Sequence, residues 1–202
     1  MVDSIVFKVF FVILSYLIGS VCFGYVVAKI FKKKDFAKKD LPGAAGTFRQ
    51  YGYKMGILTG FLDTTKAAVP ILIAKHVLGL DARTIAISCV ALVVGHNWPV
   101  FFKFMGGGGL TTTVGIGLAL APREFAIAFP SAVALGFIYK YTLRKRLKFH
   151  PNAVGGGFGV LLLPILACTY KEPWPVIAAF AIIFIIIAIK GPLLSKIYTN
   201  NR

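Results

Sequence analysis

Long apolar segments alternate with short polar ones along almost the whole chain. Because about 20 helical residues cross the roughly 30 Å hydrocarbon core of a bilayer, each apolar segment is interpreted as one membrane helix. The pattern predicts an all-α, polytopic integral membrane protein with seven transmembrane helices in a single domain, residues 1–202. The apolar segments lie at residues 5–31, 57–78, 84–104, 110–121, 125–142, 153–169 and 174–190.

Two of the seven predicted helices are short or interrupted. Segment 110–121 is too short to cross a bilayer unless it tilts or borrows residues from the preceding loop. Segment 153–169 begins in a glycine-rich stretch. Interrupted helices at membrane depth usually line a cavity inside the protein. We therefore expect a polar, cytoplasm-facing cavity built by residues 32–56, 105–113 and 144–159.

Charge and composition narrow the class of partner. The 202 residues are 57% hydrophobic and carry a formal net charge of +16. The basic residues stand beside apolar segments rather than in a separate basic domain with interleaved aromatic residues, so nucleic acid is not an expected partner. Membrane lipid and a phosphorylated substrate fit better.

Lysine and arginine are concentrated in alternate loops, which predicts the orientation. Basic clusters follow the first and fifth apolar segments, whereas only Arg83, Arg123 and Lys171 mark the loops between. The positive-inside rule then places the amino terminus outside and the carboxyl terminus in the cytoplasm. The clusters are Lys29, Lys32, Lys33, Lys34, Lys38 and Lys39, and Lys140, Arg144, Lys145, Arg146 and Lys148.

Four consecutive glycines, Gly106, Gly107, Gly108 and Gly109, form what we call the glycine loop. Without side chains to shield them, successive main-chain N–H groups can point into one concavity and hold an anion such as phosphate. Lys103 is the nearest upstream cation. A plain hinge between two helices is the alternative.

A second glycine-rich stretch follows His150 and Asn152 and comprises Gly155, Gly156 and Gly157. Its polar flank makes a second anion-binding loop possible. The alternative is a segment that simply begins the sixth helix.

Ionisable residues within the apolar segments are candidate functional groups. Asp63 and Lys66 lie three residues apart on one helix face, close enough to form an ion pair that could equally serve to hold helices together. His96 is a candidate for proton transfer, although a packed histidine bonded to a neighbouring helix is the favoured interpretation.

Several blocks in order resemble the bacterial acyl-phosphate-dependent glycerol-3-phosphate acyltransferases, a family of seven-span membrane enzymes. The blocks cover most of the chain. They are Tyr16-Leu17-Ile18-Gly19-Ser20 with Phe23-Gly24, then Pro42-Gly43-Ala44 with Phe48-Arg49 and Gly52, then Phe61-Leu62-Asp63 with Lys66 and Pro70, and finally Gly95-His96, Pro99-Val100-Phe101 and the glycine loop.

The resemblance implies transfer of a fatty acyl group from acyl phosphate to glycerol 3-phosphate, giving lysophosphatidic acid and phosphate, in the inner membrane of a bacterial cell. It implies no metal and no organic cofactor. Arg49 and His96 both have counterparts in the family and are the implied catalytic residues. The planar guanidinium of Arg49 can bind phosphate through two N–H groups. Lys39, Lys103 and the glycine loop are the implied substrate-binding residues. A homo-oligomer or a partner membrane enzyme is left open.

The chain departs from the family pattern at several polar positions. Lys39, Leu41 and Gly46 stand where the family has a serine and two asparagines, and Gly108 stands where it has a lysine. Residues 190–194 replace its closing R-H-x-x-N segment. These departures motivate an alternative, a catalytically inactive relative that binds phosphorylated lipid precursors or partners an active acyltransferase. A small transporter or exporter of an anionic solute is a third interpretation, suggested by the interrupted helices; the lack of a convincing internal repeat between the two halves counts against it.

Overall fold

The structure is a computed structural model that describes residues 4–32, 36, 40–144 and 150–199, with the backbone alone for Lys32 and residues 191–199. Every regular element in these ranges is helical, as predicted. The elements are α1 (Ile5–Ser20), α2 (Phe23–Lys32), α3 (Ala44–Tyr51), α4 (Tyr53–Leu72), the π-helix η1 (Ile73–Val77), α5 (Ala82–Asn97), the 3-10 helix η2 (Val100–Phe102), α6 (Leu110–Leu120), α7 (Pro122–Thr142), α9 (Pro151–Thr169) and α10 (Trp174–Thr199).

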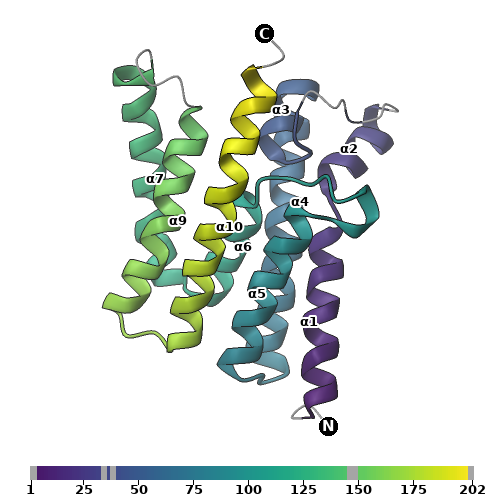
Figure 1. Ribbon diagram of the computed structural model, residues 1–202, viewed down its shortest axis with the longest axis vertical. Coiled ribbons are helices and arrows are strands. Elements are labelled where there is room, and N and C mark those ends of the chain that lie inside the picture. Colours follow the sequence, from purple (N-terminus) through teal and green to yellow (C-terminus); the bar gives the residue numbers. More distant parts are fainter. Residues whose placement is uncertain (1–3, 33–35, 37–39, 145–149, 200–202) are drawn as a thin grey trace.

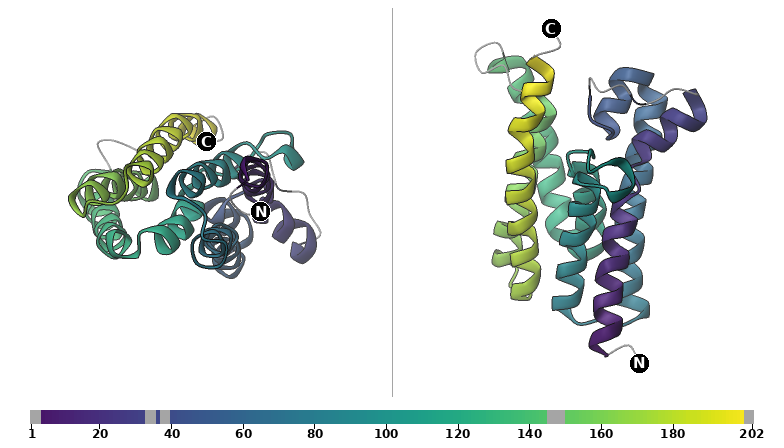
Figure 2. Two further views of the ribbon diagram at one scale, coloured as in Figure 1. Left: turned by 90° about the horizontal axis from the view of Figure 1, so that it is seen from below. Right: turned by 45° about the vertical axis from the view of Figure 1, so that its right-hand side comes forward.

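The long helices run roughly parallel to one axis and form two groups (Figure 1). Helices α1, α4 and α5 lie on one side, α7 and α9 lie on the other, and α6 lies between them (Figure 2). Helix α10 contacts both α9 and α5 and so joins the two groups. The start of α1 and the end of α10 lie at opposite ends of the molecule (Figure 1).

Within the described ranges, four helical stretches are long and apolar enough to cross a membrane, namely Tyr53–Val77, Ala82–Phe102, Pro122–Thr142 and Pro151–Thr169. A fifth is added if α1 and α2, bent by 43° at their junction, are one span. Helix α6 and residues Trp174–Lys190 are apolar but shorter. The structure confirms an all-helical protein with several apolar helices, while the number seven stays a prediction.

Helices α1 and α5 approach each other closely because both carry glycine at their contact. A β-carbon on Gly19 would overlap the main chain of Leu92, and one on Gly95 would overlap the carbonyl oxygen of Tyr16. Small residues that let backbones meet are typical of helix pairs in membranes, where lipid removes most of the hydrophobic drive for association. This contact sets the position of the carboxyl end of α5, against which the glycine loop folds.

The connection from α5 to α6 lies at an intermediate level of the bundle rather than at either end (Figures 1 and 2). Helix α6 has 11 residues and therefore a length of about 16 Å, roughly half of a hydrocarbon core. The expectation that segment 110–121 is short is confirmed.

Two predictions about loops are corrected. Residues 32–56, expected as loop, contain α3, an eight-residue helix whose weakly apolar sequence carries no membrane-span signal. Residues 155–157, considered as a second anion-binding loop, lie inside α9, which begins at Pro151. Proline is well suited to the first turn of a helix, because that turn needs no N–H from it. The stretch is thus the start of a helix.

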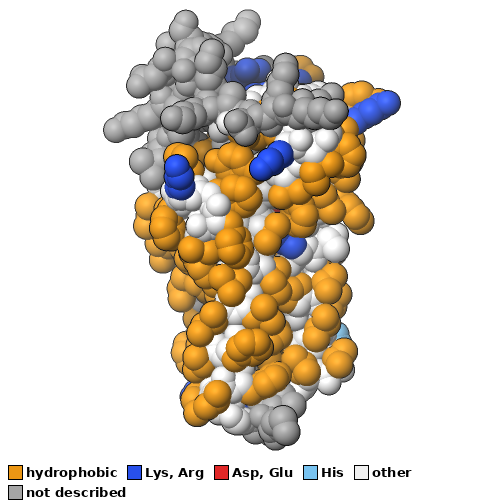
Figure 3. Space-filling model, turned by 90° about the vertical axis from the view of Figure 1, so that its right-hand side faces the viewer, with side chains coloured by type: hydrophobic (Ala, Val, Ile, Leu, Met, Phe, Trp, Pro, Cys, Tyr) orange, Lys and Arg blue, Asp and Glu red, His pale blue; other side chains and the backbone are white. Residues whose placement is uncertain are grey.

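The outer surface of the described residues is rich in large apolar side chains, including Ile5, Val77, Phe101, Phe137 and Ile189. On the face drawn in Figure 3, hydrophobic side chains cover most of the height, and lysine and arginine gather toward the end that holds α2 and α3. Such apolar coverage is expected of a protein whose surroundings are lipid rather than water.

Candidate active site at the glycine loop

A buried cluster of three ionisable side chains lies between α1, α4 and α5. The Lys66 Nζ atom lies 2.8 Å from Asp63 Oδ1 and 2.9 Å from His96 Nδ1, and it donates a hydrogen bond of 2.6 Å to the Val21 carbonyl oxygen. Asp63 and His96 are inaccessible or nearly so, and Lys66 is 8% exposed. Because isolated charges are costly in such surroundings, mutual pairing is what makes this burial tolerable. The predicted Asp63–Lys66 ion pair is confirmed.

His96 is hydrogen-bonded to the neighbouring helix through Lys66. An ammonium group can only donate, so His96 Nδ1 accepts and the ring proton is assigned to Nε2. A β-carbon on Gly107 would overlap Nε2, so this ring nitrogen faces the glycine loop directly. His96 can therefore offer a neutral N–H donor to a ligand at the loop, while proton transfer by His96 stays a prediction.

The glycine loop folds back across the carboxyl end of α5. The Gly107 N–H donates to the His96 carbonyl oxygen at 3.0 Å, and a β-carbon on Gly106 would overlap that same oxygen. Gly109 has φ 83° and precedes α6 without a side-chain cap. Close approach and a left-handed backbone thus require glycine here. One N–H of the predicted nest bonds the protein itself, while the first N–H groups of α6 remain directed toward the loop.

Two residues beside the loop, Asn97 and Lys190, were not predicted as site residues. The Lys190 Nζ atom donates to the Asn97 carbonyl oxygen at 2.7 Å and lies 4.8 Å from the centroid of the Trp98 ring. The Asn97 side chain is inaccessible, and neither of its amide atoms has a hydrogen-bond partner in the described structure. Two sequence signals could have indicated Lys190: it is a cation that closes the last apolar segment, and it stands where the family's R-H-x-x-N segment has its arginine.

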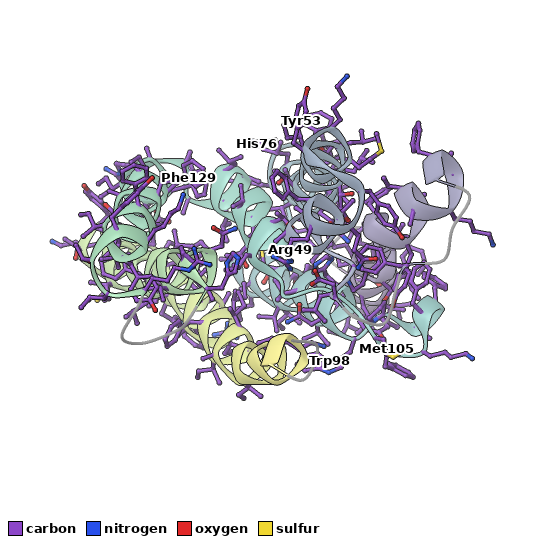
Figure 4. The ribbon with its side chains drawn as sticks, turned by 90° about the horizontal axis from the view of Figure 1, so that it is seen from above. Arg49, Tyr53, His76, Trp98, Met105 and Phe129 are labelled. Carbon is purple, nitrogen blue, oxygen red and sulfur yellow. The ribbon has the colours of Figure 1, made fainter. Side chains whose placement is uncertain are left out.

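Arg49 lies on α3 and forms a two-pronged ion pair with Asp40. The Arg49 Nε and Nη2 atoms donate to the two carboxylate oxygens at 2.6 and 2.7 Å. The Arg49 side chain is 30% exposed and that of Asp40 is 7% exposed. Seen from above, Arg49 lies near the middle of the molecule, whereas Tyr53 and Phe129 lie toward its edges (Figure 4). The carboxylate holds the guanidinium in the fork geometry that also suits phosphate.

His150 caps α9, with Nδ1 accepting a hydrogen bond from the Asn152 N–H at 3.3 Å. Burial and the positive charges of Arg49 and Arg144 lower the pKa of His150 below its usual value, against an opposing effect of Asp40. Gly43 approaches the loop too, since a β-carbon there would lie 4.0 Å from the Gly107 Cα atom. The described parts of the three segments expected to form the cavity therefore lie close together.

The remaining predicted substrate-binding residues differ in placement. Lys103 is exposed and adopts a left-handed backbone with φ 52°. Lys39 lies outside the described residues. Within the described ranges, no group of three or more His, Cys, Asp and Glu side chains is arranged to hold a metal ion.

An apolar groove of about 400 Å³ opens between α6, α7 and α9. Leu110 and Thr111, which directly follow the glycine loop, line it, and Lys140 and Asn152 stand at the end nearer α3. Along α7 the groove extends from Phe125 to Lys140, about 22 Å at 1.5 Å per residue. Its size and its mostly apolar lining suit a long hydrocarbon chain.

Comparison with known proteins identifies the family. Residues 9–192 match the family model for glycerol-3-phosphate acyltransferase. The chain belongs to the glycerol-3-phosphate acyltransferase family. The resemblance predicted from the sequence blocks is thereby confirmed.

Individual members of this family are similar in sequence to this chain over different lengths. The glycerol-3-phosphate acyltransferase of Janthinobacterium sp. (strain Marseille) is 34% identical over 79% of this chain and 84% of its own. That of Aquifex aeolicus (strain VF5) is 39% identical over 59% of this chain, and the match spans 63% of the relative's own length.

A solved structure gives the same result for the fold. The crystal structure of PlsY (YgiH), an integral membrane glycerol 3-phosphate acyltransferase in its glycerol 3-phosphate form, matches with a TM-score of 0.81 and 27% identity. The match covers 96% of this chain and 93% of PlsY. Together with the apolar helices, this match supports a multi-pass membrane protein.

Proposed function

We propose that the protein transfers a fatty acyl group from acyl phosphate to the 1-hydroxyl of glycerol 3-phosphate, forming lysophosphatidic acid and inorganic phosphate. The observation that carries the proposal is family membership over residues 9–192. The relatives' names and the glycerol 3-phosphate form of PlsY support the acceptor. The Lys190 ammonium beside the glycine loop and the amino terminus of α6 at its end support a phosphorylated ligand.

The reaction needs little covalent help from the protein. The acceptor hydroxyl oxygen attacks the carbonyl carbon of the acyl phosphate, the bond from that carbon to the phosphate oxygen breaks, and phosphate departs with the bonding electrons. The hydroxyl proton passes to the departing phosphate. Because acyl phosphate is a mixed anhydride with a good leaving group, no acyl-enzyme intermediate is required. Positioning two phosphate-bearing substrates and neutralising their charge supplies the acceleration.

In this proposal, Arg49 exchanges its ion pair with Asp40 for a substrate phosphate, which the guanidinium binds through the same two N–H groups that Asp40 holds in place in the ligand-free protein. The His96 Nε2–H group and the first N–H groups of α6 stabilise negative charge at the loop. The acyl chain lies in the groove between α6, α7 and α9, whose lining begins at the loop with Leu110.

The orientation and the number of spans belong to the proposal as well. Seven crossings, with α6 and α10 completing the set, place the amino terminus outside and the carboxyl terminus in the cytoplasm of a bacterial inner membrane. The start of α1 and the end of α10 lie at opposite ends of the molecule, which supports an odd number of crossings (Figure 1). Cys168 is exposed and lies in the last turn of α9, at the same end of the molecule as the start of α1 (Figure 1), whereas Cys22 and Cys89 are buried. A membrane-impermeant thiol reagent should label intact cells at Cys168 and spare a Cys168→Ser variant; labelling only after lysis would reverse the orientation.

The direct test of the activity is phosphate release by purified protein in lipid, supplied with palmitoyl phosphate and glycerol 3-phosphate. We expect release that depends on the acceptor and falls about a hundredfold in Arg49→Ala, the scale for loss of one charge-stabilising group. Lys54→Met, which removes an exposed lysine from the start of α4, is the matched control and should retain activity. Absence of release from folded protein would favour the catalytically inactive relative.

A further inference from the structure

Lys190 is a buried cation that pairs with no carboxylate among the residues that the structure describes. The residue is 7% exposed, and its ammonium donates a hydrogen bond to the Asn97 carbonyl oxygen at 2.7 Å. The carboxylates in the described ion pairs engage other cations: Asp40 pairs with Arg49, Asp63 with Lys66 and His96, Asp81 with Lys8, and Glu124 with Arg123. A carbonyl dipole and the Trp98 ring compensate an ammonium only in part. The arrangement leaves a positive charge to be neutralised by something that binds.

The ammonium lies at the glycine loop. A β-carbon on Gly106 would come within 2.8 Å of the same Asn97 carbonyl oxygen that accepts from Lys190. At the other end of the loop, Gly109 leads into α6, whose amino terminus has no side-chain cap. A cation from α10 and the positive end of α6 therefore act on one short loop.

An unpartnered amide completes this setting. The Asn97 side chain is fully buried, and neither amide atom has a hydrogen-bond partner in the described structure. It faces the loop, because a β-carbon on Gly109 would lie 2.9 Å from its Oδ1 atom and 3.3 Å from its Nδ2 atom. Buried polar groups normally have hydrogen-bond partners. The Asn97 amide and the nearby Lys190 ammonium therefore indicate a place for a polar ligand.

We propose that Lys190 binds a substrate phosphate at the glycine loop, with Asn97 and the amino terminus of α6 completing the anion site. Lys190 is a binding residue here and not the acid or base of the reaction. The inference rests on the proposed function for the identity of its ligand, a phosphate monoester or acyl phosphate dianion. The proposal assigns the phosphate-binding cation of the glycine loop to Lys190 on the last helix rather than to Lys103, which is exposed.

The first measurement uses inorganic phosphate as the probe and needs no turnover. Binding of phosphate to the full chain in neutral detergent, followed by calorimetry, should weaken by at least about tenfold in Lys190→Met, as expected for loss of one charge-assisted hydrogen bond. Lys190→Arg should retain binding. Lys54→Met, which removes an exposed lysine of the same charge, should match the unaltered protein. Equal phosphate affinity in Lys190→Met and Lys54→Met would overturn the proposal.

Steady-state kinetics then identify which phosphate is bound. A rise of about tenfold in KM for glycerol 3-phosphate, with kcat nearly constant, assigns the site to the acceptor, and the same rise for palmitoyl phosphate assigns it to the donor. A fall in kcat with both KM values and phosphate affinity unchanged would show that Lys190 only supports the fold. Lys190→Gln, whose amide can still donate to the Asn97 carbonyl, repeats the test if Lys190→Met does not fold.

The two proposals fail separately. Phosphate binding that depends on Lys190, in a protein that releases no phosphate from palmitoyl phosphate, would overturn the acyl-transfer proposal and support the anion site. Turnover of palmitoyl phosphate and glycerol 3-phosphate, with a phosphate affinity that does not change in Lys190→Met, would support the acyl-transfer proposal and overturn the assignment of Lys190 to the anion site.

Discussion

Two glycine-rich stretches of this chain have similar composition and opposite structural uses. The glycine loop has no regular structure and lies against His96 and Asn97, with a buried cation on either side of α5. Gly155 and Gly156 lie inside α9, where a β-carbon on Gly155 would overlap the main chain of α7 at Ala132. In the first case glycine exposes main-chain polar groups to a ligand, and in the second it lets two helices touch.

The two stretches differ in the side chains that pack against them. The ion pair of Asp63 with Lys66, together with His96, supports the glycine loop from α4 and α5. Behind α9 stand the apolar side chains of α7 and the groove. Glycine content alone therefore predicts neither an anion site nor a helix contact; the polarity of the facing residues decides.

Removing the buried charge of Lys66, which supports the glycine loop, should have the largest effect on stability. Lys66→Met leaves Asp63 buried without its cation, so we expect a loss of about 3–5 kcal/mol in the free energy of unfolding. The double variant Asp63→Asn/Lys66→Met removes both charges and should be less damaging than the single change. Denaturant titration in mild detergent checks both. A double variant that is as unstable as the sum of its parts would show that the pair does not act as a unit.

Filling the glycine loop should abolish most activity. In Gly107→Ala the new β-carbon meets the His96 ring, so the loop must move away from Nε2, and we expect acyl transfer to fall about a hundredfold. Gly157→Ala is the matched control, because a β-carbon there meets nothing within 4 Å. Phosphate-release assays on the two variants test this. Full activity in Gly107→Ala would reduce the loop to a hinge.

Filling the contact between α7 and α9 should instead affect stability. Gly155→Ala forces its β-carbon onto the Ala132 carbonyl, an overpacking change expected to cost about 1–3 kcal/mol in the free energy of unfolding. Phosphate affinity should remain that of the unaltered protein at temperatures where the variant is folded. A thermal melt paired with phosphate calorimetry separates the two outcomes, and a selective loss of phosphate affinity would place α9 in the anion site after all.

The smallest effect is expected far from both stretches, at the cap of α5. Hydrogen bonds from Lys8 and Thr84 lower the pKa of Asp81 below its usual value. The unfolded-state pKa is about 3.9, so this stabilisation is complete above that pH and is lost as pH falls through the lower folded-state value. Asp81→Asn keeps a capping oxygen without the charge, and its stability should therefore fall less steeply below about pH 4. Melting temperatures at pH 7 and pH 3 give the comparison; identical pH dependence in both proteins would exclude this linkage.

The sequence by itself determined the helical class, the family and the pairing of Asp63 with Lys66. These follow from local properties: long apolar segments need helices in lipid, ordered blocks of residues identify relatives, and a spacing of three residues fixes which side chains share a helix face. The same local reasoning missed α3, whose eight residues carry little apolar signal.

Only the tertiary structure decided which residues surround the glycine loop. Lys190 lies 93 positions from Asn97 in sequence, and its ammonium reaches the loop because α10 packs against α5. His96 meets Lys66 across 30 positions because the close contact of α1 with α5 fixes where α5 ends. Contacts of this kind depend on how whole helices pack. Helix packing in turn depends on side chains from several segments together, so no single segment predicts it.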